Sequence, residues 1–431
     1  MQFILFLVIF FSLSFNALSM PVAPLNHLQG RSFKVERVKR NGDVAHGPAA
    51  LRKAYRKFGI DETTLNGVDV SDFQPFDTKH TTTASVKVAK EDAVNSEQTG
   101  AVDATSVDGD VEFVSPVNIG GQTFDMNFDS GSADMWVLSS KLPKSLRTSR
   151  EVYEPSKSTS FEELNNSTFE IKYGDSSYAT GEVGKDDVSI GGVKVAGQSF
   201  GLATDISQTF AEDTKSNGIV GLGFSSINTV TPVSQHTFFD NVARSLSEPV
   251  FTVRLLSNGV GEYEFGTVDH SKYRGVMANV SVDSSKGFWQ FDSTQYAIGG
   301  GPLHPITNAP SAIADTGTSL MLASPDVAEA YYKQVDGAIF ANNANGYIFP
   351  CTSSLPSLSV AIGAGYSATI PGSFMNWSEV GTNTTTGETV CYGGIQSSGS
   401  SSMAIYGDVF LKALFVVFDQ RGPSLGFAAP A

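Results

Sequence analysis

The sequence predicts a mostly β protein made of two related lobes. A short stretch occurs twice, as Asp129–Ser132 (Asp-Ser-Gly-Ser) and as Asp315–Thr318 (Asp-Thr-Gly-Thr), each directly preceded by an apolar residue. A second pair, Ile219–Gly221 and Ile405–Gly407, follows, and each glycine lies 92 positions after the corresponding aspartate. Two matched elements at one spacing indicate a duplicated unit. Each lobe would then contribute one carboxylate to a shared cleft.

Composition and patterning favour strands over helices. The chain has 431 residues, enough for two domains with a substantial core, and 17% of them are charged while 42 are glycine. From residue 111 onward, short alternating runs are interrupted by Gly, Asn and Ser, and Val188–Val195 with its inner Gly-Gly predicts a hairpin. The few helices expected in this part are 236–246 and 325–335.

The N-terminus predicts export from the cell. Phe3–Leu13 is nearly all apolar but too short for a comfortable membrane span, and Ala17–Ser19 offers small residues for cleavage. We therefore expect a signal peptide at residues 1–19 and a secreted, extracellular protein. The last six residues, 426–431, do not form a hydrophobic tail, so no membrane association is expected.

Charge separates a basic leader from an acidic body. Residues 27–60 contain nine Lys and Arg against two acids, whereas residues from 101 onward contain 17 Lys and Arg against 34 Asp and Glu. Such a leader can dock on the body by charge at neutral pH and loosen when carboxylates are protonated. We expect a propeptide over about 20–100, with a helix at 49–58, an N-terminal β lobe at 101–280 and a C-terminal β lobe at 281–431.

Two kinds of covalent modification are expected in a secreted chain. Cys351 and Cys391 are the two cysteines, and one disulfide is the natural interpretation, with a pair of buried thiols as the alternative. Possible glycan sites are the sequons at Asn165, Asn166, Asn279, Asn376 and Asn383.

The motifs together resemble those of the pepsin-like aspartic endopeptidases. Besides the two Asp-Ser/Thr-Gly stretches, the match includes Trp136, Tyr173–Asp175, the glycine-rich 218–223 and Ala404–Phe410. The resemblance covers roughly residues 113–431 and is greatest to the secreted fungal enzymes of the penicillopepsin and aspergillopepsin type. It implies a bilobal pepsin-like fold, with two related β-barrel-like lobes and a cleft between them.

The resemblance implies that Asp129 and Asp315 are catalytic. Two carboxylates held close together cannot easily both ionise, so they share a proton. The ionised carboxylate takes a proton from a bound water while the protonated one polarises the peptide carbonyl. In the family, Gly131 and Gly317 offer backbone N–H groups near the carboxylates, and the hydroxyls at the positions of Ser132 and Thr318 hold them coplanar.

Three further residues match the flap, the hairpin that closes over substrate in this family. Tyr173, Gly174 and Asp175 form this match, and in the family the tyrosine hydroxyl bonds the tryptophan at the position of Trp136. An acid at the position of Asp175 can accept Lys on the amino side of the scissile bond. The alternative is that Asp175 is a solvated turn residue.

The leader also resembles the propeptides of this family, in which a Lys followed by an aromatic residue blocks the paired aspartates. Lys57 and Phe58 are the candidate pair here. The alternative is that Lys57 is part of a solvated helix face.

Other enzyme classes fit less well. None of the three histidines beyond the leader, His236, His270 and His304, lies in a nucleophile motif, and they are not clustered as metal ligands. A two-carboxylate glycosidase would not explain the Gly-Ser/Thr neighbours or the flap. The acidic body argues against nucleic acid as a partner.

The prediction is therefore a secreted acid endopeptidase that is made as an acid-activated zymogen. It should cleave proteins or peptides between large hydrophobic residues, act as a monomer, and need neither a cofactor nor a metal. The non-enzyme alternative is a catalytically inactive relative that binds peptides in the cleft.

Overall fold

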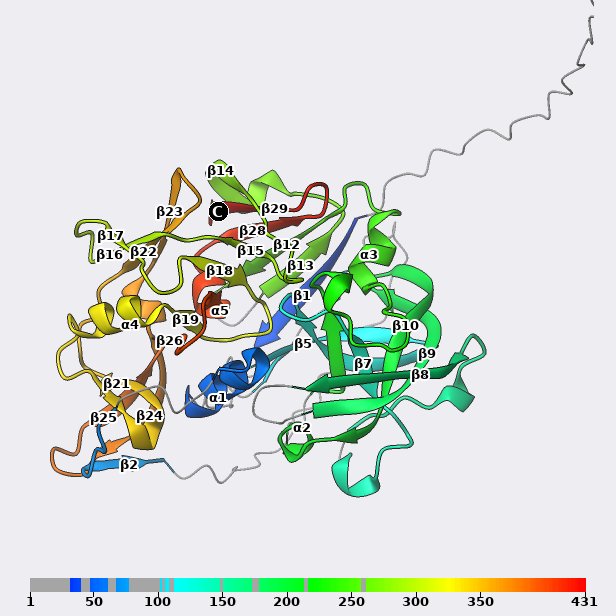
Figure 1. The fold of residues 1–431 in the computed structure, drawn as a ribbon, viewed down its shortest axis with the longest axis horizontal. Coiled ribbons are helices and arrows are strands. Elements are labelled where there is room, and N and C mark those ends of the chain that lie inside the picture. The colour runs from blue at the N-terminus through cyan, green and yellow to red at the C-terminus, as the bar shows by residue number, and fades with distance from the viewer. Residues whose placement is uncertain are drawn as a thin grey trace, which may run out of the picture.

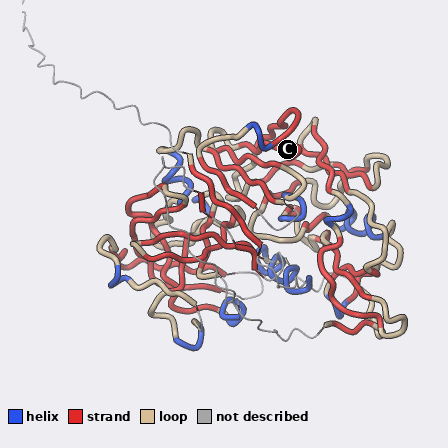
Figure 2. The backbone as a smooth tube through the Cα atoms, turned by 180° about the vertical axis from the view of Figure 1, so that it is seen from behind, coloured by secondary structure: helices blue, strands red, loops and turns tan. Residues whose placement is uncertain are grey.

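The chain folds into a mostly β structure with two lobes, as the sequence predicts. The computed structural model describes residues 32–39, 47–60, 67–76, 101–102, 105–107, 112–147, 150–172, 178–212, 216–256 and 261–431. Strands account for nearly half of the described backbone, and the helices are short (Figure 2). The expected signal peptide lies outside the described residues.

The N-terminal lobe contains long, curled strands. Its elements are β5 (Glu112–Ile119), β6 (Gln122–Asp129), β7 (Met135–Leu138), β8 (Glu162–Lys172), β9 (Tyr178–Ile190), β10 (Val193–Ile206), α2 (Gln208–Glu212), β11 (Gly218–Gly221) and α3 (Phe238–Ala243). The β9–β10 turn is the predicted hairpin: Gly191 and Gly192 have φ of 56° and 85°, a conformation that favours glycine.

The C-terminal lobe contains shorter strands arranged in three sheets. Its elements are β15 (Gln290–Asp292), β16 (Gln295–Ile298), β17 (His304–Pro305), β18 (Ser311–Ala314), β19 (Met321–Ala323), α4 (Pro325–Tyr332), β20 (Ile339–Ala341), β21 (Gly346–Pro350), β22 (Leu358–Ile362), β23 (Tyr366–Ile370), β24 (Asn376–Asn383), β25 (Thr389–Gly393), β26 (Ile395–Ser397), β27 (Ala404–Tyr406) and α5 (Asp408–Leu411).

A sheet joins the two lobes, and the leader, by which we mean the chain before about residue 100, contributes a strand to it. The joining strands are β12 (Val250–Leu255), β13 (Gly261–Phe265), β14 (Tyr273–Ser281), β28 (Phe415–Asp419) and β29 (Ser424–Pro430). The leader strand β1 (Phe33–Lys39) pairs antiparallel with β13 and parallel with β3 (Ala101–Val102) and β4 (Thr105–Val107). The leader also forms α1 (Gly47–Phe58), which lies between the lobes, and β2 (Phe73–Pro75) (Figure 1).

The predicted duplication is confirmed by the strand register. In the first lobe β11 pairs parallel with β6, so that Ile219 lies opposite Asn127. In the second lobe β27 pairs parallel with β18, so that Ile405 lies opposite Ile313. Both pairs are 92 positions apart, and β7 and β19 pair antiparallel with β11 and β27 in the same way. The repeated sequence stretches therefore occupy equivalent places in the two lobes.

The predicted helices exist, with shorter or shifted bounds. The prediction at 236–246 corresponds to α3, whose Phe238, Phe239 and Val242 are buried. The prediction at 325–335 corresponds to α4, which ends at Tyr332. The leader helix α1 begins two residues before the predicted start and stops at Gly59, whose φ of 63° favours glycine. Among the described residues, no helix is both long and apolar enough to cross a membrane.

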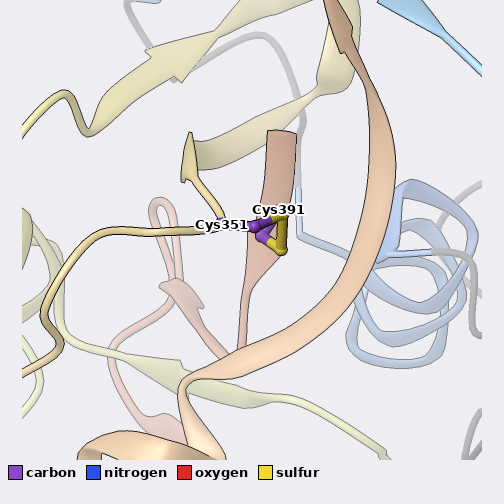
Figure 3. Close-up of a disulfide and its surroundings, with 2 residues drawn as sticks. All are labelled: Cys351 and Cys391. Atoms are coloured by element: carbon purple, nitrogen blue, oxygen red, sulfur yellow. A yellow bond between two sulfur atoms is a disulfide. The ribbon is translucent and has the colours of Figure 1, made fainter. Parts of the chain in front are cut away.

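The predicted disulfide between Cys351 and Cys391 is present (Figure 3). The two Cα atoms are 4.9 Å apart, and the bond links the residue after β21 to β25, two strands that already pair. The alternative of two buried thiols is therefore wrong. Because the bond closes a loop of 40 residues, the chain-entropy model gives it about 4 kcal/mol of stabilisation.

Candidate active site

The two repeated aspartates lie at the ends of equivalent strands. Asp129 is the last residue of β6, and Asp315 directly follows β18. Their relative exposures are 3% and 0%, so both carboxylates are withdrawn from solvent in the presence of the leader. Burial of two carboxylates is costly unless hydrogen bonds or opposite charge compensate it.

Each carboxylate receives the same pair of hydrogen bonds. The Gly131 N–H donates to Asp129 Oδ1 at 2.8 Å, and the Ser132 hydroxyl donates to Asp129 Oδ2 at 2.7 Å. In the second lobe, the Gly317 N–H donates to Asp315 Oδ1 at 3.0 Å and the Thr318 hydroxyl to Asp315 Oδ2 at 2.5 Å. Two donors on each carboxylate fix its plane and favour its ionised form.

The two glycines also allow the lobes to approach each other. A Cβ added at Gly131 would lie 2.6 Å from Asp315 Oδ1, and one added at Gly317 would lie 2.4 Å from Asp129 Oδ1. Each glycine therefore touches the carboxylate of the other lobe. Any side chain at these positions would separate the two aspartates.

Ser130 and Thr316 cross-link the two stretches, a role that sequence reasoning missed. The Thr316 hydroxyl accepts from the Ser130 N–H at 3.0 Å and donates to the Phe128 carbonyl at 2.9 Å. Reciprocally, the Ser130 hydroxyl accepts from the Thr316 N–H at 2.9 Å and donates to the Ala314 carbonyl at 2.8 Å. The sequence feature that could have indicated this role is a hydroxyl side chain at the second position of both repeats. This buried network fixes the position of the Asp129 stretch relative to the Asp315 stretch.

We expect Thr316→Val to lower the free energy of unfolding by about 1–3 kcal/mol, because it removes the acceptor of the buried Ser130 N–H and one of the donors to the buried Phe128 carbonyl. Denaturant unfolding of the full chain measures this change. The matched control is Thr369→Val, which removes an exposed hydroxyl whose one side-chain partner among the described residues is Ser359, and it should change stability by less than about 0.5 kcal/mol. Equal effects of the two substitutions would contradict the structural role of the network.

Lys57, on the leader, contacts both aspartates. Its Nζ lies 2.5 Å from Asp129 Oδ1 and 2.7 and 2.8 Å from the two oxygens of Asp315. The Lys57 side chain is 8% exposed, so the ammonium is buried between the two carboxylates. The structure therefore brings together the three charged residues that the sequence singled out at this site.

The helix that carries Lys57 is held on the C-terminal lobe by apolar packing. Leu51, Ala54 and Tyr55 of α1 are buried in a cluster with residues of that lobe, and the Tyr55 hydroxyl donates to the Ser397 carbonyl at 2.8 Å. The Phe58 ring packs edge-on against Phe288 at 6.1 Å between centroids. Lys57 lies in the last turn of α1, where the helix dipole favours a cation.

The pKa values at the site follow from burial and from this charge triad. Burial alone would lower the pKa of Lys57, but the charges of Asp129 and Asp315 outweigh it and raise the pKa above the ordinary lysine value. Burial opposes ionisation of both carboxyls. For Asp129 the Lys57 ammonium outweighs burial and holds the pKa below its ordinary value, whereas for Asp315 burial together with the Asp129 charge keeps the pKa raised.

The groups nearest to the two carboxylates are proton donors: backbone N–H groups, two hydroxyls and one ammonium. Across the described ranges, no three His, Cys, Asp or Glu side chains are grouped in a way that could hold a metal ion. The chemistry that this arrangement offers is proton transfer between a carboxyl pair and a molecule bound in the place of Lys57 Nζ.

The flap residues are not placed by the structure, because Tyr173, Gly174 and Asp175 lie outside the described residues. Their flanking strands are described: β8 ends at Lys172 and β9 begins at Tyr178, and the two pair antiparallel. Trp136 lies in β7, is 3% exposed, and contacts the ring of Phe210 edge-on at 5.5 Å. Its indole Nε1 is buried and has no hydrogen-bond partner among the described residues.

Asp134, five residues after Asp129, is a further residue that sequence reasoning did not single out. Its carboxylate accepts hydrogen bonds from the Thr229 N–H and hydroxyl, both at 3.0 Å, and from the Asn228 amide at 3.1 Å. Burial raises the pKa of Asp134 to about 6. The carboxylate thereby ties the loop that follows Asp129 to residues 228–229.

Comparison with known proteins gives concordant matches. A family model described as eukaryotic aspartyl protease matches residues 112–430. The sequence is 57% identical over 430 residues to a protein named as an aspergillopepsin A-like aspartic endopeptidase of Aspergillus fumigatus, covering 100% of this chain and 99% of that one. It is 45% identical over 403 residues to the aspartic protease PEP3 of Coccidioides posadasii, with coverages of 93% and 90%. Aspergillopepsin-1 of Aspergillus clavatus is 46% identical over 332 residues, with coverages of 77% and 82%.

Proposed function

The chain belongs to the eukaryotic aspartyl protease family and is an aspartic endopeptidase with a bilobal pepsin-like fold, and on this premise we propose that Asp129 and Asp315 are its catalytic pair. One observation carries the proposal. Two buried carboxylates, one from each repeat, accept hydrogen bonds from equivalent donors in their own lobes. Both contact a single cation, Lys57 Nζ, that lies between them.

The proposed reaction uses a water molecule in the place that Lys57 Nζ occupies. One carboxylate, ionised, takes a proton from this water while the water oxygen bonds to the peptide carbonyl carbon. The other carboxyl donates its proton to the carbonyl oxygen. Collapse of the resulting intermediate breaks the C–N bond, and the proton held by the first carboxyl passes to the leaving amine. One hydroxyl of the intermediate returns its proton to the second carboxyl, so that a carboxylic acid forms and the pair again shares one proton. The two groups titrate as a pair, so the two roles belong to the pair rather than to fixed residues.

We assign residues 20–100 to a propeptide that inhibits the enzyme through Lys57. While Lys57 Nζ contacts both carboxylates, neither a water molecule nor a peptide carbonyl can take its place. Removal of α1 would therefore be required before substrate can bind. The signal peptide at 1–19 and the maturation point near residue 100 belong to the same proposal.

The effect of the Lys57 ammonium on the pKa values of the two carboxyls supports activation by acid. Burial and the Asp129 charge raise the pKa of Asp315, but the Lys57 ammonium acts against this rise, so docking of Lys57 favours the ionised form of Asp315 and is opposed by its protonation. The pKa of Asp129 is lowered, so its ion pair contributes fully to docking above the ordinary carboxyl pKa and is lost as the pH falls through the lowered value. Docking of the leader should therefore weaken during acidification, because Lys57 lowers the pKa of both carboxyls.

The remaining assignments concern substrate and modification. We propose that Tyr173, Gly174 and Asp175 close over the substrate, that large apolar residues flank the scissile bond, and that Asp175 accepts Lys. Asn165, Asn166, Asn279 and Asn376 are exposed and suit glycosylation in a secreted protein. Asn383 suits it less well, because its side-chain amide donates to Asp72 of the leader at 3.0 Å.

Cleavage of haemoglobin by the acidified full chain, across pH 2–7 with and without pepstatin, tests the proposed function. We expect cleavage in acid that pepstatin abolishes, together with a loss of roughly 10 kDa from the chain as the leader is removed. Cleavage that is maximal at neutral pH, or that pepstatin leaves unchanged, would refute the proposal. Pepstatin binding without any cleavage would instead support the inactive peptide-binding relative, which the intact carboxyl pair does not favour.

A further inference from the structure

A second part of the leader, residues 67–76, lies as an extended strap on the C-terminal lobe. Its strand β2 adds to the edge of β24 in antiparallel register, with Phe73 opposite Asn383, Gln74 opposite Thr382 and Pro75 opposite Gly381. The pairing continues on both sides, since the Phe76 N–H donates to the Val380 carbonyl at 3.0 Å and the Thr384 N–H to the Asp72 carbonyl at 2.6 Å. The strap therefore completes a sheet of the lobe.

The beginning of the strap is attached at a separate place, the turn 340–343. The Val68 N–H donates to the Phe340 carbonyl at 3.0 Å, and the Asn342 N–H donates back to the Val68 carbonyl at 3.0 Å. The side-chain amide of Asn343 donates to the Val70 carbonyl at 2.9 Å. Both ends of the strap are thus bound by backbone hydrogen bonds, at two points of the same lobe.

Phe73 anchors the middle of the strap. Its side chain is 8% exposed and belongs to an apolar cluster that includes Ile348, Val380 and Val390 of the lobe. Beside it is a cavity of about 70 Å³, lined from the lobe by residues of β20, β21 and β25 and from the strap by Val70 and Phe73. The surface under the strap is therefore shaped for an extended segment with an aromatic residue at its centre.

Two glycines make this close contact possible. A Cβ added at Gly381 of the lobe would lie 2.4 Å from both the Gln74 carbonyl oxygen and the Phe73 ring, and its three nearest atoms all belong to the strap. A Cβ added at Gly67 of the strap would lie 2.3 Å from the Asn342 side chain and 2.4 Å from Phe340. At both glycines the strap and the lobe are in such close contact that a methyl group would not fit between them.

We propose that β24 and the turn 340–343 form a second binding site for the leader, one that holds residues 67–76 independently of the Lys57 ion pairs. The inference rests on the proposed role of residues 20–100 as a propeptide. It adds an order of events: α1 leaves the carboxyl pair first, while the strap stays bound to the C-terminal lobe and keeps the leader attached.

The Lys57 contact and the strap contact differ in their dependence on charge, and the proposed order of release requires such a difference. Lys57 is held by charge, which acid removes. The titratable groups of the strap and of the surface around it are Asp69, Asp72, Glu379 and Glu388, all of them carboxylic acids, and among the described residues none forms an ion pair across this contact. Asp69 and Asp72 instead accept from the amides of Asn342 and Asn383 at 3.2 and 3.0 Å. Acidification breaks no ion pair here.

Hydrogen–deuterium exchange of the unprocessed full chain at pH 7 tests the inference, with four variants compared to the wild type. Lys57→Ala should speed exchange of amides in α1 at least tenfold while leaving 73–76 and 380–384 within about threefold of the wild type. Gly381→Ala should speed exchange of the amides in 73–76 and 380–384 at least tenfold while leaving those in α1 within about threefold of the wild type. Gly365→Ala is the matched control, because a Cβ there meets nothing within 4 Å, and it should change neither segment. Phe73→Ala lies in the leader, so the sequence of the lobe stays that of the wild type. It should nevertheless speed exchange in the same segments as Gly381→Ala.

Two results would overturn the proposal. In the first, Lys57→Ala frees α1 and the strap equally, which would mean that both leave as one unit through the apolar cluster that they share. In the second, Gly381→Ala and Phe73→Ala leave residues 73–76 as protected as in the wild type. The exchange measurement needs no catalysis. A chain that fails the haemoglobin assay can therefore still pass this test, and a chain that cleaves in acid can still fail it.

Discussion

Asp129→Asn and Asp315→Asn are each expected to lower kcat/KM for a peptide substrate by about 10⁴-fold or more. Each substitution removes a carboxyl group that must both hold and release a proton, while the amide keeps nearly the same shape and its oxygen can still accept from the backbone N–H of Gly131 or Gly317. Turnover of the acid-activated variants on one peptide substrate, compared with the wild type, measures the loss.

The control for this prediction is Asp283→Asn. Asp283 is an exposed carboxylate that accepts a hydrogen bond from the Ser285 N–H at 3.0 Å, and its loss should leave kcat/KM unchanged. Circular dichroism of each variant separates loss of chemistry from loss of fold. If either Asp129→Asn or Asp315→Asn cleaves the substrate at a rate within tenfold of the wild type, the carboxyl pair is not the catalyst.

Lys57→Ala is expected to increase the open fraction of the unprocessed chain by about 10²–10⁴-fold. Removing one partner of a buried ion pair costs about 3–5 kcal/mol, because the charges left behind are buried without compensation. Here two carboxylates would face each other under the leader. The free energy of leader docking should fall by this amount, and each 1.4 kcal/mol is a factor of ten in the equilibrium.

Pepstatin binding to the unprocessed chain at pH 6 measures this opening, since the apparent dissociation constant falls as the competent fraction rises. Arg52→Ala is the matched control: Arg52 lies on the same helix but forms no ion pair with either aspartate. It should bind pepstatin as weakly as the wild type. A Lys57→Ala chain that remains as closed as the wild type would show that the ammonium does not hold the leader in place.

The duplicated core of the fold could be predicted from the sequence because its signal is local and repeated. The 92-residue spacing that links Asp129 to Gly221 reappears in the structure as parallel pairing of β6 with β11 and of β18 with β27. The hairpin at Gly191–Gly192 was predictable for a similar reason, since a turn that needs positive φ selects glycine. The helix bounds were less accurate, because the ends of α3 and α4 depend on tertiary packing.

The contacts that could not be predicted join residues far apart in the chain. Ser130 and Thr316 are 186 positions apart, and a hydroxyl at each position has no local reason to indicate a partner in the other lobe. The strap is similar: Gly67–Phe76 has little periodicity, and its complement, β24, lies about 300 positions later. Lys57 was found only through resemblance to known propeptides, since its place between the carboxylates follows from the docking of α1.

The activity of the double variant Asp129→Asn/Asp315→Asn, measured beside the two single variants, tests most directly whether one carboxyl from each lobe acts in a single catalytic unit. The effects of substituting groups that act as a unit are strongly non-additive, so all three chains should show the same residual kcat/KM. If the double variant instead loses activity by the product of the two single losses, the aspartates act independently, and the proposed pair would be wrong.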